Sequence, residues 1–285
     1  MTNIKLLTET AADIDSELQT LYDIGILPTW VTVFGEDYSS DPSWLLPPSK
    51  ELFLEAFEKK EYPTVFQPSA FLWKEEVEKY IKEGYNKILY ISLSKRFGGG
   101  CKQFTILKTL LKAQYPDVEL EVIDSTSVGA ALKLQVIRVA EYLRHENHSF
   151  EEACSFAESL TKKTQVFWLP KDNELINFSG RASKLEEELP YPIMYCEDGK
   201  LVEKFFKTHK ERIDYLTNHF KESPIRRVEA TYSYDKSKED LFELIHNISS
   251  SLDYTINIAN KITLFSPTTA AVVGLDAMCL GVEYK

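Results

Sequence analysis

Short apolar runs alternate with longer amphipathic stretches over roughly the first 125 residues. The runs IKLL at 4–7 and ILYIS at 88–92 are apolar nearly throughout, which is typical of strands covered on both faces of a parallel sheet. Residues 102–115 and 127–147 instead place apolar side chains at the helical period. Because strands and helices alternate, we predict right-handed crossovers and a mainly parallel sheet flanked by helices.

Local start and stop signals predict where several of these helices begin and end. A helix within residues 8–25 is expected to stop at Gly25, and Ser49 is the expected N-cap of a helix at 50–60. Ser149 with Glu152 fits a capping box that opens a helix at 150–163. The helix after Pro68 is expected to have one apolar face, formed by Phe71, Val77, Tyr80 and Ile81.

A new pattern starts after residue 163, where TQVFWL begins. Two strands around Asp198-Gly199 are predicted to form a hairpin, followed by a helix near 210–220, a strand near 226–234 and a helix near 238–251. We therefore predict an α/β protein of two domains: residues 1–163 with the parallel sheet, and residues 164–285 as a smaller α/β (α+β) unit.

Composition and charge narrow the class of protein. The chain has 285 residues, with 33 Lys and Arg against 44 Asp and Glu, which gives a net charge of −11. Since no basic stripe could follow a phosphate backbone, we expect no nucleic-acid partner. No stretch approaches the roughly 18 apolar residues of a membrane span, and the first residues turn polar and acidic too early for a signal peptide. We expect a cytoplasmic protein without a transmembrane segment.

The cysteines and histidines give no sign of a metal site. No CxxC pair occurs, and the five histidines lack the spacing of zinc ligands. The four cysteines fit free thiols in a reducing compartment: Cys101, Cys154, Cys196 and Cys279. We expect no metal and no cofactor.

The segment ISLSKRFGGGCKQF at 91–104 is the strongest candidate for a binding site. It follows a buried strand, carries Ser94, Lys95 and Arg96, and then passes through glycines into a helix N-terminus. In open α/β sheets ligands bind beyond the carboxyl ends of the strands, and exposed amides at a helix N-terminus favour an anion. Three glycines can equally form a simple turn, and their spacing fits neither a P-loop nor a dinucleotide-binding fingerprint.

A second segment, PTVFQPS at 63–69, is expected at the same end of the sheet. Its Thr64 hydroxyl can donate a hydrogen bond to a carboxylate or phosphate oxygen, although a role for Thr64 in a turn or cap is the simpler interpretation.

Catalysis by Ser94 or Cys101 would need a neighbouring base. No GxSxG elbow occurs, and the histidines are expected on solvated helix surfaces. Three carboxylates could lie near the pocket, of which Asp124 is as easily explained by a turn or cap: Glu9, Asp13 and Asp124. No catalytic set can be assembled, so we do not expect an enzyme.

Five motifs, taken in order, resemble the DegV family of bacterial fatty-acid-binding proteins: PTVFQPS, ISLSKRFGGGCKQF, VIDSTSVGAAL, NFSGRAS and CEDGKLV. Each motif is weak alone, but their collinear order covers nearly the whole chain. The resemblance implies two α/β domains, with a long-chain fatty acid in a hydrophobic tunnel closed by the second domain. It also implies presentation of that fatty acid to a separate fatty acid kinase, for phospholipid synthesis.

By this resemblance Thr64 and Ser94 would hydrogen-bond the fatty acid carboxylate, and the amide at Gly99 would complete the site. The chain departs from the family pattern at Lys95, Gly98 and Gly100, where the family has hydroxyl side chains. Near the C-terminus the family has an H-x-G-P-G loop whose histidine contacts the carboxylate. Here Gly274 aligns with that loop and Val272 stands where the histidine is expected, so Lys95 or Arg96 would have to supply the positive partner.

The same resemblance assigns kinase docking to Arg181, within NFSGRAS, and to an arginine pair that is replaced here by Lys207 and His209. A set of large apolar residues surrounds the two candidate loops in the sequence and is expected to be core or tunnel lining: Phe34, Phe66, Phe71, Trp73, Phe97, Phe104, Leu107 and Leu110.

Two alternatives to a fatty acid carrier remain at this point. One is an enzyme acting on a small carboxylated or phosphorylated metabolite at the glycine segment. The other is a divergent, non-presenting lipid-binding regulatory paralog.

Overall fold

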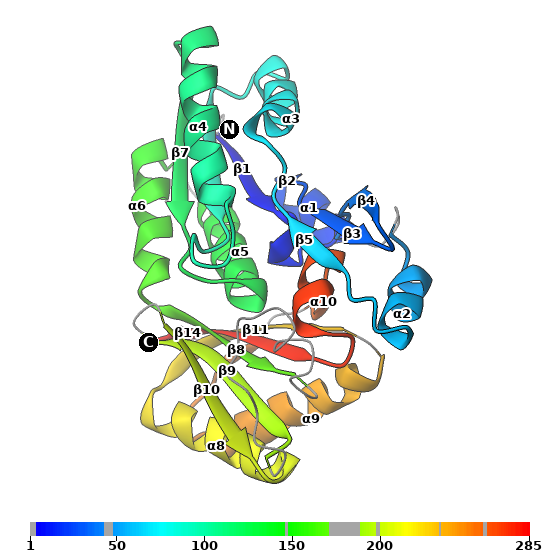
Figure 1. Cartoon of the computed structure of the whole chain (residues 1–285). Helices are drawn as coiled ribbons and strands as arrows, with labels where there is room; N and C mark the ends of the chain where they lie inside the picture. Colours follow the sequence, from blue (N-terminus) through cyan, green and yellow to red (C-terminus); the bar gives the residue numbers. More distant parts are fainter. Residues whose placement is uncertain are drawn as a thin grey trace.

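The computed structural model describes residues 4–42, 48–145, 148–170, 189–197, 200–233, 235–258 and 261–285 (Figure 1). Its first sheet is wholly parallel, with strand order β2-β1-β6-β7. The strands are β1 (Ile4–Glu9), β2 (Ile24–Leu27), β6 (Lys87–Ser92) and β7 (Glu119–Asp124). The predicted parallel sheet is confirmed.

Helices cover both faces of this sheet, as the continuous apolar strands require. The helices are α1 (Ser16–Tyr22), α3 (Ala70–Lys82), α4 (Gly100–Gln114), α5 (Gly129–His145) and α6 (Phe150–Thr161). Along β6, Ile88 and Tyr90 pack in the core with α3 and α4, whereas Leu89 and Ile91 pack in the core with α5 and α6. Successive side chains of a strand point to opposite faces, so one apolar run serves two cores.

A small antiparallel sheet, with order β4-β3-β5, lies beside the first. Its strands are β3 (Trp30–Val33), β4 (Glu36–Ser39) and β5 (Thr64–Phe66), and α2 (Lys50–Glu58) packs against it. Ser49 caps α2 and Ser149 forms the predicted capping box with Glu152, so both capping predictions are confirmed.

Two local predictions are wrong. Helix α1 ends at Tyr22, with Asp23 in the left-handed conformation as its cap, whereas Gly25 lies inside β2. Gly25 has no room for a side chain because Leu7 and Tyr80 pack against its Cα. Phe71 is 69% exposed, so it does not share the buried face of α3, where Trp73 and Val77 lie.

The second large sheet begins at Thr164 and is mixed, with order β10-β9-β8-β14-β11-β12 and β13 paired to β11. Its strands are β8 (Thr164–Leu169), β9 (Tyr191–Glu197), β10 (Lys200–Phe206), β11 (Ile225–Tyr232), β12 (Asn257–Ile258), β13 (Thr263–Leu264) and β14 (Met278–Tyr284). Strands β9 and β10 pair antiparallel as the hairpin prediction requires, although Asp198 and Gly199 lie outside the described residues.

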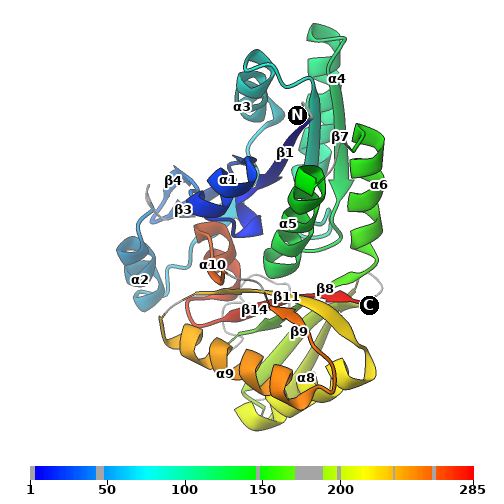
Figure 2. The ribbon, with the colours of Figure 1, turned by 180° about the vertical axis from the view of Figure 1, so that it is seen from behind.

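Helices α8 (His209–Glu222) and α9 (Asp235–Ser251) cover one face of this sheet, and α5 lies across the other (Figure 2). The molecule is therefore α/β, a parallel sheet flanked by helices joined to a mixed-sheet unit. None of the described helices combines the length and apolar character needed to cross a bilayer.

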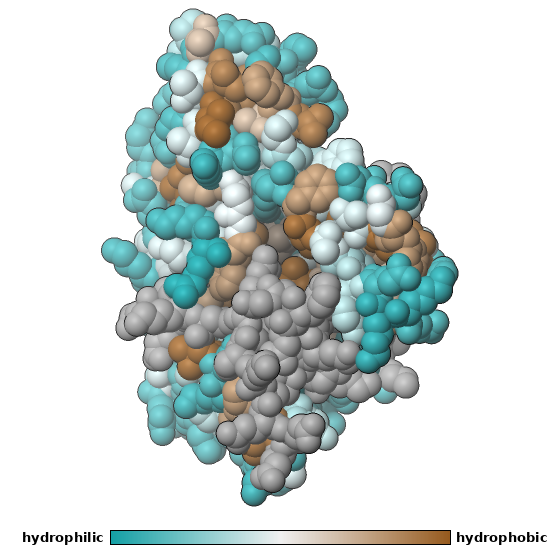
Figure 3. All heavy atoms as spheres, viewed as in Figure 1, coloured by the Kyte–Doolittle hydropathy of each residue, from teal (hydrophilic) through white to brown (hydrophobic). Residues whose placement is uncertain are grey.

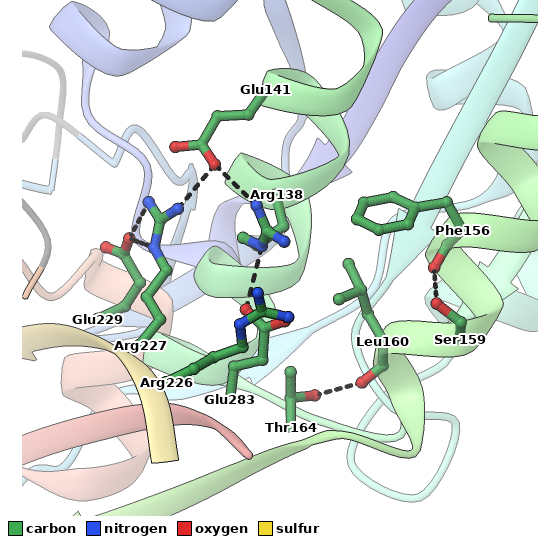
Figure 4. A network of polar contacts seen from close by, with 10 residues as sticks. All are labelled: Arg138, Glu141, Phe156, Ser159, Leu160, Thr164, Arg226, Arg227, Glu229 and Glu283. Atoms are coloured by element: carbon green, nitrogen blue, oxygen red, sulfur yellow. Dashed lines mark hydrogen bonds and ion pairs between the residues drawn. The ribbon is translucent and has the colours of Figure 1, made fainter. Parts of the chain in front are cut away.

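The two large sheets are joined by charged side chains of α5 and of the second sheet (Figure 4). Arg138 on α5 lies 3.0 Å from Glu283 on β14. Glu141, also on α5, lies 2.7 Å from Arg227 on β11. Deeper in the interface, the fully buried Lys133 lies 3.4 Å from Glu229 on β11 and donates to the Lys261 carbonyl at 2.9 Å. Such buried pairs fix the orientation of α5, because removing one partner would leave an uncompensated charge.

Near the C-terminus the chain returns to the first half of the molecule through α10 (Pro267–Val273), which the sequence analysis did not identify. This helix packs against β3, β5 and the 3-10 turn η1 (Thr10–Ala12), and Figure 1 shows it between the two large sheets. Asp13 holds it there: the Asp13 carboxylate accepts from the Ser266 amide at 2.8 Å and from the Thr269 hydroxyl at 2.7 Å.

The burial of Asp13 leads to a prediction of how the free energy of unfolding depends on pH. Burial raises the pKa of Asp13 to about 6. The folded state retains this proton more strongly than the unfolded chain does. The contribution of Asp13 to stability is therefore fully present below about pH 4, and about 3 kcal/mol of it is lost as the pH rises through the folded-state pKa of about 6. Asp13→Asn keeps the Oδ1 acceptor and lacks this ionisation, so its stability relative to wild type is expected to rise by that amount between pH 4 and 7.

Urea unfolding at several pH values measures this difference. The control is Asp117→Asn on an exposed site, whose curve should run parallel to that of wild type. An Asp13→Asn curve that is also parallel would contradict the prediction.

Gly281 on β14 makes a second prediction about the interface with α5. A Cβ at Gly281 would overlap the backbone of Ala130 and Ala131. Gly281→Ala is expected to lower the free energy of unfolding by about 3 kcal/mol, because neither backbone can move aside. Gly99→Ala, whose added Cβ would lie 3.7 Å from its nearest neighbour, should lower it by less than about 1 kcal/mol. Equal losses in denaturant titrations would refute the argument.

Candidate ligand-binding site

The chain that leaves the carboxyl end of β6 forms a tight turn, here called the glycine loop (residues 93–100). The Ser94 amide donates to the Ser127 carbonyl at 2.9 Å, which ties the loop to the segment after β7. The amides of Phe97 and Gly98 both donate to the Ser94 carbonyl, at 2.8 and 3.1 Å. The Gly98 amide is thus engaged inside the turn.

Helix α4 begins at Gly100, with Gly99 as its N-cap. The first N–H groups of a helix have no acceptor within the helix, so the amides after Gly98 can receive an anion. Ser94 is 5% exposed, and its Oγ accepts a hydrogen bond from the Arg96 amide at 3.3 Å. Its hydroxyl proton can still be donated, so Ser94 and the α4 N-terminus together offer donors to a carboxylate.

The reason for the glycines is close packing beneath them. A Cβ at Gly100 would overlap the Glu9 carboxylate and lie 2.7 Å from the Tyr90 hydroxyl, and a Cβ at Gly98 would lie 2.7 Å from the Leu93 side chain. Gly99 is different, since its only near neighbour is the Gln67 side chain at 3.7 Å. Two of the three glycines are therefore required by buried side chains, apart from any role in binding.

The cationic side chains of the loop point away from its interior. The Lys95 side chain is 78% exposed and its Nζ lies 3.6 Å from Asp124 Oδ2. Asp124 also accepts from the amides of Lys95 and Thr126, at 3.3 and 3.0 Å, which confirms its interpretation as a turn residue. Arg96 is exposed and lies near Cys196 of the second sheet. Burial raises the pKa of the Cys196 thiol, and the charge of Arg96 offsets part of that rise.

Thr64 lies within β5 rather than in a loop, opposite Thr32, and its side chain is exposed. The loop that follows β5 does reach the glycine loop, because Gln67 contacts Gly99 and lies 3.8 Å from the Cβ position of Gly98. The structure thus brings together the two predicted segments, with Gln67 rather than Thr64 at their contact.

An apolar pocket opens beside the glycine loop. Its lining comes from η1, β5, the glycine loop, β8, α10 and the segment that follows β7. The lining residues are Ala11, Val65, Leu93, Phe97, Val128, Trp168, Thr268, Thr269, Val272 and Val273. Apolar side chains are also visible on this face of the molecule, in the region between α4 and β5 (Figure 3). Segments that are more than 250 residues apart in the chain therefore form one site.

Val272 lies in this pocket and Gly274 ends α10 with φ 92°, a conformation that favours glycine. Within the predicted set of large apolar residues, only Phe97 lines the pocket. Trp73, Phe104 and Leu107 belong instead to the core between the first sheet and α3 and α4. Thr268 and Thr269 were missed because the short helix α10 carries no apolar period that would reveal it. Trp168 was missed because the pattern of β8 does not show which structure covers it.

No catalytic set is present among the described residues. Burial raises the pKa of the Cys101 thiol, and Asp124 raises it further, which disfavours a nucleophilic thiolate. Two histidines that were expected on solvated faces make hydrogen bonds with other side chains. His209 Nδ1 lies 2.7 Å from Arg212, and His219 Nε2 lies 3.1 Å from the Tyr284 hydroxyl. The described part of the chain also contains no group of His, Cys, Asp and Glu that could hold a metal ion.

Of the two docking residues, Arg181 lies outside the described residues. Lys207 is exposed just before α8, and its amide donates to Glu211 at 3.0 Å.

Known structures with this fold include lipid-binding proteins. A DegV lipid-binding protein from Thermotoga maritima superposes with a TM-score of 0.82 at 19% identity, covering 99% of this chain and 98% of that one. The Fatty Acid Kinase B3 protein of Streptococcus pneumoniae, loaded with linoleic acid, gives 0.82 at 16% identity over the full length of both chains.

Sequence comparison finds relatives at low identity. A DegV domain-containing protein of Clostridium acetobutylicum is 25% identical over 254 residues, covering 86% of this chain and 87% of that protein. A fatty acid-binding protein of Thermotoga maritima is 26% identical over 187 residues, covering 64% and 62%. The family model for "Uncharacterised protein, DegV family" matches residues 3–285. This chain belongs to the DegV family.

Proposed function

We propose that this protein binds a long-chain fatty acid, with the acyl chain in the apolar pocket and the carboxylate at Ser94 and the N-terminus of α4. The observation that carries the proposal is the position of the pocket. Its lining is mostly apolar and includes Leu93, the residue directly before Ser94. Apolar space next to hydrogen-bond donors suits an amphipathic ligand.

The energetics favour such a ligand even though the family's histidine is replaced. Each CH₂ group removed from water contributes roughly 0.8 kcal/mol, so the chain supplies most of the affinity. Val272 adds apolar surface where a histidine would add a donor. In this proposal Lys95 and Arg96 act at long range, since both are exposed and Lys95 is paired with Asp124. In the same proposal Thr64, exposed on β5 next to the pocket residue Val65, donates a second hydrogen bond to the carboxylate.

We further propose that the bound fatty acid is presented to a fatty acid kinase, with Lys207 and Arg181 on the docking surface. The support is the family relationship and the exposure of Lys207. Residues 164–285 would then form the domain that closes over the ligand, because β8 and α10 supply Trp168 and Val272 to the pocket.

Presentation is tested with a bacterial fatty acid kinase and this protein loaded with fatty acid. Acyl phosphate is expected to form, and Lys207→Glu is expected to reduce its formation several-fold. No product with wild type would refute presentation but not fatty acid binding.

Ligand binding itself is tested by native mass spectrometry of the purified protein with added oleate or palmitate. One bound fatty acid per chain is expected. Ser94→Ala should weaken binding by about 5- to 10-fold and Thr64→Ala by less, because each removes one hydrogen bond to the carboxylate. Thr109→Ala, on the exposed side of α4, is the control and should leave affinity unchanged. Absence of any uptake by wild type would overturn the proposal.

The location of the acyl chain is tested by filling the pocket. Val272→Trp places an indole among Leu93, Phe97 and Trp168, and it is expected to reduce oleate affinity at least 100-fold, since the chain would lose its apolar contacts. Ile106→Trp, at a side chain that is 43% exposed on α4, adds the same group away from the pocket and should bind oleate as wild type does. Equal affinity of the two variants would place the chain elsewhere.

A further inference from the structure

Glu9 lies directly beneath the glycine loop. It ends β1 and is completely buried. Its Oε1 accepts from the Tyr90 hydroxyl at 2.6 Å and from the Leu93 amide at 2.8 Å. On the loop side it packs against the Cα of Gly100, the first residue of α4. The carboxyl group is therefore fixed under the turn where the ligand's carboxylate is proposed to lie.

Two buried polar atoms near the loop have no hydrogen-bond partner. They are Glu9 Oε2 and Gln67 Nε2. Gln67 lies on the Gly98 and Gly99 side of the loop, and its amide is close enough to influence the ionisation of Glu9. This acceptor and this donor lie near each other without a close hydrogen bond, so the buried Glu9 carboxyl is incompletely paired, and a buried polar group without a partner costs about 1–3 kcal/mol.

An ionised Glu9 would be a buried negative charge without a cation. Burial raises its pKa, against the lowering effects of the hydrogen bonds from Tyr90 and Leu93 and of the nearby Gln67 side chain. The titratable groups that face it are Tyr90 on β6, whose own pKa is raised well above its usual value, and Cys101 on α4. Neither is positively charged, so these titratable neighbours supply no cation for an anion at this position.

We propose that Glu9 holds a proton beneath the glycine loop, and that a carboxylate ligand binds there only together with this proton. The inference rests on the proposed function and assigns a positioning role to a residue outside the pocket lining. A neutral Glu9 leaves the helix N-terminus free to attract the ligand, whereas an ionised Glu9 beneath Gly100 would repel it.

The proposal fixes the sign of a pH dependence. The protonated protein binds the anion more tightly, so affinity is constant below the pKa of Glu9 in the free protein. Above that pH the affinity falls by up to about 10-fold per pH unit, with uptake of one proton per ligand.

Decanoate is a suitable probe, because it is soluble and fully ionised from pH 6 upward. Calorimetric titrations between pH 6 and 10, in buffers of different ionisation enthalpy, measure both affinity and proton uptake. Wild type should lose affinity and take up a proton as the pH rises. Glu9→Gln, which retains Oε1 as acceptor for Tyr90 and Leu93 and cannot ionise, should bind with constant affinity and no proton uptake.

Two further variants keep the test decisive. Tyr90→Phe removes a hydrogen bond that stabilises the Glu9 anion, so the fall in affinity should move to higher pH. Glu121→Gln removes a carboxylate that is 40% exposed on β7 and should keep the wild-type profile. A Glu9→Gln profile with the wild-type slope, or a flat wild-type profile, would overturn the role of Glu9. Failure of wild type to bind decanoate or oleate at any pH would instead refute the proposed function.

Discussion

Helix α5 packs against both large sheets, and this contact fixes how the two sheets are placed around the pocket. Most of this helix is buried, and it touches the first sheet on one side and β8, β11 and β14 on the other. The contact with β14 is possible because Gly281 lets the backbone of Ala130 approach closely. Lys133, Arg138 and Glu141 then pair with carboxylates and an arginine of the second sheet. This orientation places Trp168 on β8 opposite Val128, and so defines the pocket.

The glycine loop shows how one motif can satisfy a structural and a functional demand. Gly100 has no side chain because the Glu9 carboxyl and the Tyr90 hydroxyl occupy that space, and Gly98 because Leu93 folds against it. The same absence of side chains leaves the amides at the start of α4 open to an anion. Packing below the loop and binding above it are therefore coupled through a few atoms. That coupling is the physical basis for linking ligand affinity to the ionisation of Glu9.

The pocket joins parts of the chain that are far apart in sequence. Asp13, at the end of η1, accepts from Ser266 and Thr269 and thereby holds α10 beside β3 and β5. Its burial is unusual for an aspartate and reflects this demand. Val272 reaches the pocket only because α10 is anchored in this way, so the character of the binding site depends on a buried carboxylate that does not line it.

Local patterns in the sequence identified the strands of the parallel sheet, the capped helices and the change of pattern near residue 164, because these depend on periodicity and on caps within a few residues. The sequence also located the glycine loop and, through collinear motifs, the family. It did not determine that Gly25 lies in a strand, that Phe71 is exposed or that Trp73 and Phe104 belong to a core away from the pocket. It proposed Glu9 near the pocket and the segment that contains Gln67, but it revealed neither α10 nor the packing of Glu9 beneath Gly100. Only the tertiary structure decided these features, because each arises from contacts between residues that are tens to hundreds of positions apart, and no local pattern records them.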